Sequence, residues 1–352
     1  MGKLPPPMQI AKGQCKDTTS PLPQQIKGQA NTRKKCANFT CRDGVLLDTI
    51  AQLDHPPTHS KDVAYLKKRA KNAFFSKELA RNLTTLDSPL NKAYRRTLFD
   101  CGSMLIQEGQ KLTGKYCNSR WCNTCNRIRT AKLTNGYRNA LEAFSAPQFV
   151  TLTIPNVGKE SLQETIRMML ESIVLIIRSR RRKKIEVNGI RKLECTYNAD
   201  RDDYHPHFHF ILDGEDNAKW LIDEWLKRYP TASREAQHYR QADSNSLMEI
   251  FKYTTKIVSK SSKGDTRIYI PALDVIFQAM YRIRTFQSFG KIRMVSEDID
   301  DVQSDTYDIP FYESVVWVWQ GNDWYSMLSG DPLTGYEPSA RMMELVNEKM
   351  VV

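Results

Sequence analysis

The stretch Tyr204-His-Pro-His-Phe-His-Phe-Ile-Leu212 decides how the central part of this 352-residue chain folds. Side chains of a β-strand alternate between its two faces. His205, His207 and His209 therefore point to one side, whereas the intervening phenylalanines point into a core. Imidazoles spaced two residues apart on one face can converge on a metal ion. The chain has only six histidines, so three within five residues favour a metal site over a polar strand face.

A second predicted strand, residues 190–197, precedes this one and is joined to it by the turn-like run 198–203. It carries Glu194 among apolar residues, where an unpaired carboxylate would be costly. Glu194 is therefore a candidate metal ligand from the neighbouring strand. An exposed position, or a salt bridge to Arg191 or Lys192, is the alternative explanation.

The flanking sequence alternates between strand and helix patterns. The predicted elements, in chain order, are strand 148–154, helix 160–183, strand 190–197, strand 204–212, helix 217–227, strand 236–241 and helix 246–259. A helix at 272–284 and a strand at 315–319 follow, and a basic amphipathic helix begins near Lys61. The order β-α-β-β-α-β-α predicts an α+β fold, with a split βαβ antiparallel sheet that has helices on one face.

The predicted helix 246–259 carries a candidate nucleophile. Glu249 and Tyr253 are four residues apart and share a face, as do Lys252 and Lys256. A phenol can attack a phosphodiester if a metal polarises the phosphorus and a cation stabilises the phenolate. A packed tyrosine among ordinary helix ion pairs is the alternative.

Four of the eight cysteines predict a thiolate Zn²⁺ site: Cys101 and the run Cys117-x4-Cys122-x2-Cys125. Without a secretory signal, clustered cysteines are more often metal ligands than disulfides, and buried free thiols are the alternative. No acidic residue lies between Glu108 and Glu142. The basic side chains around the cluster are candidate duplex-DNA contacts, among them Arg120, Arg127, Arg129 and Lys132.

Charge is unevenly distributed along the chain. The segment from Glu297 to the C-terminus holds twelve acidic but only two basic residues, although the whole chain has a net charge of +12. The strongly basic remainder indicates a polyanionic partner, nucleic acid before membrane. Basic charge that only aids solubility is the alternative, and composition alone does not decide between the two. No apolar run approaches the ~18 residues of a membrane span, and no signal peptide is recognisable. We therefore expect a cytoplasmic protein.

Taken together, these segments resemble the rolling-circle replication initiator (Rep) proteins of small plasmids, which belong to the HUH endonucleases. The resemblance lies in His205-Pro-His-Phe-His209 and in Glu249-x-x-Lys-Tyr253-x-x-Lys256. Phe149-Val-Thr-Leu-Thr-Ile-Pro-Asn156 looks like the family's first motif, and Cys117 to Arg127 looks like its cysteine-rich region. The family's usual proline after the second cysteine of that region is Asn123 here. The likeness covers about residues 95–295.

The resemblance implies a role for each residue of these motifs. His207 and His209 would be the metal pair for Mg²⁺ or Mn²⁺, with His205 beside them; a pair of His205 and His209 stays open. Tyr253 would be the nucleophile, and Glu249 the base for a later attack by water.

The implied function is initiation of plasmid replication by a site- and strand-specific nick at the origin. Cleavage leaves a 5′-phosphotyrosine and a 3′-OH, and later cleavage and rejoining terminate the round. The implied partners are origin DNA, single-stranded and as hairpin or duplex, together with a host helicase and polymerase, and no membrane. A relaxase or single-strand transposase of the same chemistry, and a non-catalytic zinc DNA-binding regulator, are the alternatives.

We expect four regions along the chain. They are a flexible arm (1–60), a helical and cysteine-rich DNA-binding region (61–145), an HUH endonuclease domain (146–295) and an acidic C-terminal extension (296–352).

Overall fold

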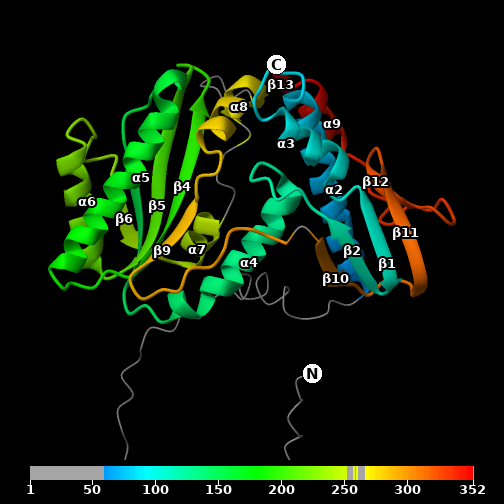
Figure 1. The fold of residues 1–352 in the computed structure, drawn as a ribbon, viewed down its shortest axis with the longest axis horizontal. Coiled ribbons are helices and arrows are strands. Elements are labelled where there is room, and N and C mark those ends of the chain that lie inside the picture. Colours follow the sequence, from blue (N-terminus) through cyan, green and yellow to red (C-terminus); the bar gives the residue numbers. More distant parts are fainter. Residues whose placement is uncertain (1–58, 252–256, 258, 261–265, 301, 352) are drawn as a thin grey trace, which may run out of the picture. The chain divides into compact units, whose positions relative to one another are not determined.

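The computed structural model describes residues 59–251, 257, 259–260, 266–300 and 302–351. The predicted flexible arm lies outside these residues except for its last two positions. The described chain has mixed α+β structure with mainly antiparallel sheets, which confirms the predicted class (Figure 1). None of the described helices has both the length and the apolar character that a membrane span requires.

The central sheet has five strands in the order β6-β3-β5-β4-β9, and every neighbouring pair is antiparallel. Its strands are β3 (Pro147–Thr153), β4 (Gly189–Asn198), β5 (Asp203–Asp213), β6 (His238–Gln241) and β9 (Phe286–Phe289). The first four are the predicted strands, with bounds shifted by one or two residues. A tight turn closes the β4–β5 hairpin, where the Asn198 side chain accepts hydrogen bonds from the backbone N–H groups of Asp200 and Arg201.

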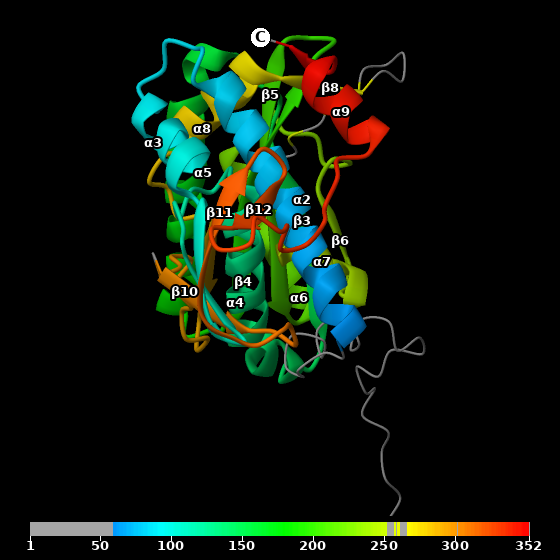
Figure 2. The same cartoon turned by 90° about the vertical axis from the view of Figure 1, so that its right-hand side faces the viewer.

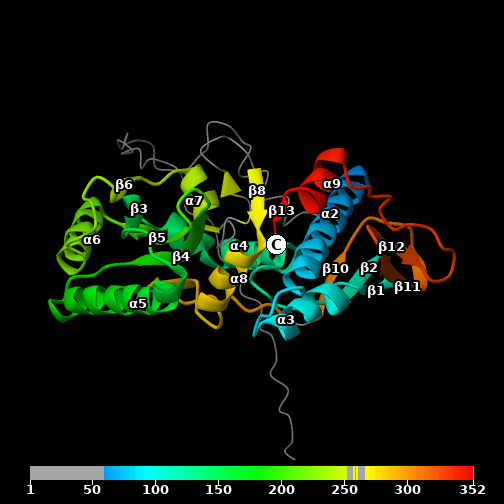
Figure 3. The ribbon, with the colours of Figure 1, turned by 90° about the horizontal axis from the view of Figure 1, so that it is seen from above.

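Helices α5 (Lys159–Arg182) and α6 (Glu215–Arg228) pack against one face of this sheet (Figure 3). The strand side chains that meet these helices are apolar and fully buried, among them Val150, Leu152, Phe208 and Phe210. The two phenylalanines of β5 therefore lie in the core, as predicted, and alternation directs the histidines of the same strand to the opposite face.

A second pair of helices, α4 (Asn123–Glu142) and α7 (Ser244–Phe251), covers part of that opposite face. Phe149, Ile190 and Ile211 form one cross-strand row there. The row is buried against side chains that include Tyr137 of α4 and Ile250 of α7. The prediction of helices on one face only is wrong. This end of the sheet is apolar on both faces, so helices pack against each face and shield it from water.

The predicted helix 246–259 also ends earlier than expected. Ser259–Lys260 is strand β7 and pairs with β8 (Thr266–Tyr269). The β-branched pair Ile257-Val258 just before β7 favours an extended chain over a helix. The predicted helix 272–284 is shorter as well, because α8 spans Ile270–Ala279.

The N-terminal part of the described chain is helical, as predicted. Helix α2 (His59–Leu83) is followed by α3 (Asn91–Arg95) and a π-helical turn, Arg96–Asp100. Of the apolar stripe predicted in this region, Leu66, Ala70 and Phe74 are buried, whereas Val63 is exposed.

A second sheet joins segments that are far apart in the sequence, in the order β10-β2-β1-β11-β12 (Figure 2). Its strands are β1 (Met104–Gly109), β2 (Lys111–Lys115), β10 (Val302–Thr306), β11 (Tyr312–Gln320) and β12 (Asp323–Ser326). Leu66 and Ala70 of α2 pack on it together with Trp317 and Trp324. The acidic C-terminal segment thus supplies three of the five strands, so pairing crosses the predicted region boundaries, which themselves stay predictions.

The chain ends close to α8. Helix α9 (Ala340–Asn347) leads into β13 (Met350–Val351), which pairs in parallel with β8.

A short segment at the start of the acidic region, residues 297–299, forms what we call the strap. The Glu297 carboxylate accepts hydrogen bonds from the Phe286 backbone N–H at 2.8 Å and from Arg120 Nε at 3.2 Å. Its backbone carbonyl accepts a bond from Arg129 Nε at 2.7 Å. Ile299 packs on the cysteine cluster. The strap therefore ties β9 to helix α4 and to the cysteines.

Replacing Glu297 by Ala should lower the free energy of unfolding by about 2–4 kcal/mol, because it leaves the buried Phe286 N–H without an acceptor and Arg120 without its counter-charge. Urea denaturation followed by circular dichroism measures this loss. The matched control is Glu313→Ala, an exposed position on β11, for which we expect less than ~0.5 kcal/mol. Equal losses in the two variants would contradict this role of the strap.

Candidate functional site

The structure brings Glu194, His207 and His209 together on the face of the central sheet opposite α5 and α6. Glu194 of β4 lies directly across from His207 of β5 in the antiparallel register. One potential ligand atom from each of the three residues lies within 4.8 Å of the others. Two imidazoles and a carboxylate are a donor set that suits a divalent cation, and the spacing permits all three to bind the same ion.

Hydrogen bonds orient both imidazoles. His207 Nδ1 lies 3.0 Å from the backbone oxygen of His205, so Nδ1 carries the proton and Nε2 keeps its lone pair. His209 Nδ1 lies 3.1 Å from the hydroxyl of Thr151 on β3. The Nε2 atom of His209 faces the Glu194 carboxylate at 3.7 Å. Both rings can therefore present Nε2 to a metal ion.

His205 lies at the edge of this group. Its Nδ1 is 2.8 Å from the side-chain oxygen of Asn156, and its ring stacks on His207 with centroids 5.0 Å apart. Burial, followed by the charge of His207, lowers the pKa of His205 to about 4, and the same two causes lower the pKa of His209 to about 4. Both rings are therefore neutral near pH 7, as metal ligation requires.

The surroundings of Glu194 are compatible with two of the roles that the sequence left open, a salt-bridge partner and a metal ligand. Its Oε2 lies 2.9 Å from Lys192 Nζ, so the salt bridge is present. The same oxygen makes no well-oriented hydrogen bond despite its burial, so it keeps the capacity to bind a cation. Burial alone would raise the pKa of Glu194, but the charges of Lys192 and His207 bring it below its ordinary value. Glu194 is thus ionised at neutral pH.

Lys192 is a residue that sequence reasoning did not select for the site. Its side chain is fully buried, and its Nζ donates a hydrogen bond to the Glu249 backbone oxygen at 3.1 Å. The ammonium group therefore links the Glu194 carboxylate to helix α7. The signal was present in the sequence, because a lysine two residues before Glu194 must share its face of the strand.

Helix α7 brings Glu249 close to the histidines. The carboxylate of Glu249 raises the pKa of His209, against the stronger effect of burial. Lys252, Tyr253 and Lys256 lie outside the described residues.

The four predicted cysteines also come together. Cys101, Cys117, Cys122 and Cys125 are all buried, and their Sγ atoms lie within 4.8 Å of one another. Three of the Sγ···Sγ distances are 3.5, 3.6 and 3.7 Å, too long for a disulfide of ~2.05 Å. They approach the ~3.8 Å edge of a tetrahedron whose metal–sulfur bonds are about 2.3 Å. Hydrogen bonds from the other three thiols lower the pKa of Cys117.

The cations predicted to contact DNA have partners inside the protein. Arg129 is only 4% exposed and donates to Asn118 and Glu297, and its DNA contact stays a prediction. Arg120 pairs with the Glu297 carboxylate, and Lys132 donates to the Asp298 carbonyl. The Arg127 guanidinium lies 4.0 Å above the ring of Tyr65. For Arg120, Arg127 and Lys132 the DNA contact stays a prediction.

Replacing Lys192 by Met should lower the free energy of unfolding by about 3–5 kcal/mol, because it leaves the buried Glu194 carboxylate without its counter-charge. The double variant Lys192→Met/Glu194→Leu should recover much of this loss, since no buried charge then remains unpaired. Urea denaturation in the presence of a chelator measures both. The matched control is Lys159→Met, whose exposed ammonium lies 3.7 Å from Glu160; a single-variant loss no larger than this control would refute the role of Lys192.

Comparisons with known proteins find similarity to replication proteins. A family model described as "Replication protein" matches residues 109–217. The "Protein rep" of Staphylococcus aureus is 25% identical over 212 residues, which cover 54% of this chain and 92% of that protein. The "Protein rep" of Streptococcus pneumoniae is 26% identical over 193 residues, 48% of this chain and 60% of that protein. A third "Protein rep", from a Bacillus species, is 29% identical over 152 residues, 38% of this chain and 49% of that protein.

No solved structure matches this chain. The family match begins in the second sheet and runs through Cys117, Cys122 and Cys125, α4 and both histidine-site strands to the start of α6. Residues 109–217 thus match the replication-protein family, and the chain is similar to Rep proteins over up to 54% of its length, which supports its recognition as a plasmid rolling-circle replication initiator.

Proposed function

We propose that this protein initiates plasmid replication by cutting one strand of the origin DNA through a covalent tyrosine intermediate. The observation that carries the proposal is the convergence of Glu194, His207 and His209 on the sheet face that α7 borders. Tyr253 follows in the sequence, two residues after the last described residue of α7.

The donor set fits a hard divalent cation. His207, His209 and Glu194 would hold Mg²⁺ or Mn²⁺, which supplies polarisation of the scissile phosphate when bound. The free Nε2 lone pair of His207, the neutral His209 ring and the Glu194 carboxylate support this fit, because each offers a lone pair to a cation. His205, held by Asn156, would steady His207 through ring stacking.

In the proposed step, the Tyr253 phenolate oxygen forms a bond to phosphorus as the bond from phosphorus to the 3′ oxygen breaks. The products are a 5′-phosphotyrosine and a free 3′-OH, which a host polymerase extends after a host helicase has opened the duplex. Lys252 and Lys256 would stabilise the phenolate. Glu249 would later take a proton from water at the regenerated junction, so that hydrolysis replaces a second tyrosine link.

The central sheet supports this assignment. Its strand order, with α5 and α6 as the two crossovers, agrees with a split βαβ palm. One face is closed by the two crossover helices, whereas the other carries the candidate metal ligands. A single strand laid across that open part of the face would place its phosphate at the histidines.

Replacing Tyr253 by Phe should abolish the covalent protein–DNA adduct while DNA affinity stays within a few fold, because only the phenol oxygen attacks and cationic contacts carry affinity. The assay incubates the protein with Mn²⁺ and single-stranded DNA from the encoding replicon, and maps adducts by mass spectrometry. The matched control is Tyr239→Phe, on β6, which should retain the adduct. Adduct formation by Tyr253→Phe would refute the nucleophile; no adduct in the unaltered protein would favour a non-catalytic DNA-binding regulator.

A structural Zn²⁺ in the cysteine cluster is the second part of the proposal. The tetrahedral spacing of the four thiols and their complete enclosure support it. The ion would join Cys101 to the N-terminal turn of α4, and the strap residue Ile299 would shield it from solvent.

Metal analysis of the purified protein should find zinc in a ratio of one per chain, and Cys125→Ser should lose most of it. The reason is that a tetrahedral site with three thiolates and a hydroxyl binds zinc far more weakly. The matched control is Cys195→Ser, a buried thiol of β4 outside the cluster, which should keep its zinc. Zinc-free protein in which all four thiols react freely in the folded state would contradict the proposal.

A further inference from the structure

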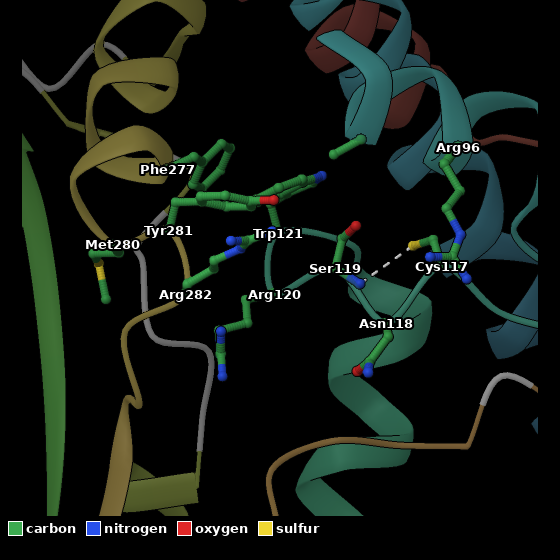
Figure 4. Close-up of a pocket in the computed structure, with 11 residues that line it drawn as sticks. Arg96, Cys117, Asn118, Ser119, Arg120, Trp121, Phe277, Met280, Tyr281 and Arg282 are labelled. Carbon is green, nitrogen blue, oxygen red and sulfur yellow. Dashed lines mark hydrogen bonds between the residues drawn. The ribbon is translucent and has the colours of Figure 1, made fainter. Parts of the chain in front are cut away.

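A pocket lies beside the cysteine cluster, between the loop that enters α4 and the end of α8 (Figure 4). Its volume is about 210 Å³. It shares no residue with the candidate metal site on the central sheet. Its lining residues are Ala93, Arg96, Cys117, Asn118, Ser119, Arg120, Trp121, Phe277, Met280, Tyr281 and Arg282.

Aromatic rings form one side of the pocket. The Trp121 ring lies against Phe277, with centroids 5.2 Å apart and planes inclined by 32°. The Tyr281 ring is 46% exposed at the same pocket. A flat aromatic group that is open to solvent is the kind of surface on which a nucleic-acid base stacks.

Three arginines complete the lining, and none of the eleven lining residues is acidic. The Arg282 guanidinium lies 5.2 Å from the centroid of the Tyr281 ring. Arg120 also lines the pocket, and its Nε pairs with the Glu297 carboxylate at 3.2 Å. Arg96, from the π-helical turn, adds a third positive charge. Aromatic faces combined with guanidinium groups match the two chemical parts of a nucleotide, its base and its phosphate.

The backbone of the pocket is unusual at two positions. Asn118 has φ of 55° and Arg282 has φ of 58°, the left-handed region that non-glycine residues rarely adopt. Such conformations cost free energy and persist mainly where a site needs them. Here they lie on facing walls of one pocket, on two segments that are remote in sequence.

We propose that this pocket holds one unpaired nucleotide of single-stranded DNA, with its base on Tyr281 and its phosphate at Arg282, while Arg96 and Arg120 add positive charge to the lining. The pocket is smaller than the ~300–1,000 Å³ of a typical small-molecule site, so it has no room for more than one nucleotide. A base within a duplex is stacked on its neighbours and cannot enter. The inference deepens the proposed function, on which it rests, by adding a second contact that retains the single strand away from the nicking site.

The test measures the affinity of the full-length protein for a fluorescein-labelled single-stranded oligonucleotide of mixed sequence by anisotropy. Tyr281→Ala should weaken binding by about 5-fold or more, and Tyr281→Phe should restore it, because stacking needs the ring and not the hydroxyl. Arg282→Gly removes a cation and relaxes the left-handed backbone, so it should lower affinity while the protein stays folded. It should also reduce the slope of log affinity against log salt by about 0.7.

The matched controls are Phe311→Ala, which removes a 76% exposed ring outside the pocket, and Arg341→Gly, which removes an exposed cation of α9. Both should change single-strand affinity by less than twofold. Equal effects of Tyr281→Ala and Phe311→Ala would overturn the proposal, as would equal loss of single-strand and duplex affinity in Tyr281→Ala.

A photocrosslinking measurement identifies the contact directly. The same oligonucleotide with 5-iodouracil in place of thymine should crosslink to Tyr281 or Trp121. If every crosslink maps to other peptides, the proposal is overturned. The Tyr253 adduct is measured in the same samples. If the Tyr253 adduct forms but single-strand affinity does not depend on Tyr281, the pocket proposal alone is refuted. If single-strand affinity depends on Tyr281 but no adduct forms, the nicking function alone is refuted.

Discussion

The antiparallel pairing of β4 with β5 sets Glu194 directly across from His207, and the candidate metal site depends on that register. A shift of one residue would turn Glu194 into the hydrophobic core and bring Leu193 to the histidine face. The register is held from the opposite side of the sheet, where Phe208 and Phe210 are completely buried against α5 and α6. Apolar packing that takes no part in metal binding therefore determines which polar side chains meet.

Lys192 adds a second constraint on the same face. Its ammonium group contacts the Glu194 carboxylate and also the backbone of Glu249, so one cation holds both the sheet ligand and helix α7. Burying such a charged pair costs desolvation free energy that the attraction between the charges only partly offsets. Apolar residues in these two positions would avoid this desolvation free energy. We therefore interpret the charges of Lys192 and Glu194 as a requirement of the chemistry at this face.

The acidic C-terminal segment contributes to the fold on the far side of the cysteine cluster. Glu297 meets Arg120 and the backbone of Phe286, while Ile299 covers the thiols. Strands β10, β11 and β12 then complete the sheet begun by β1 and β2. Part of the basic charge around the cysteines is thereby neutralised within the chain, including that of Arg120 at the edge of the pocket.

The sequence by itself determined the α+β class, the strands of the histidine hairpin and the two clusters of ligand residues, because alternation and helical periodicity are local properties of the chain. It also indicated the replication-protein family from the order of its motifs. Three features were decided only by the tertiary structure: the pairing of β1 with β11, the burial of Arg129, and the pocket that joins Trp121 to Tyr281. Each brings together segments more than a hundred residues apart in the sequence. Local periodicity predicts which face of an element is buried, but it does not predict which distant segment packs against that face.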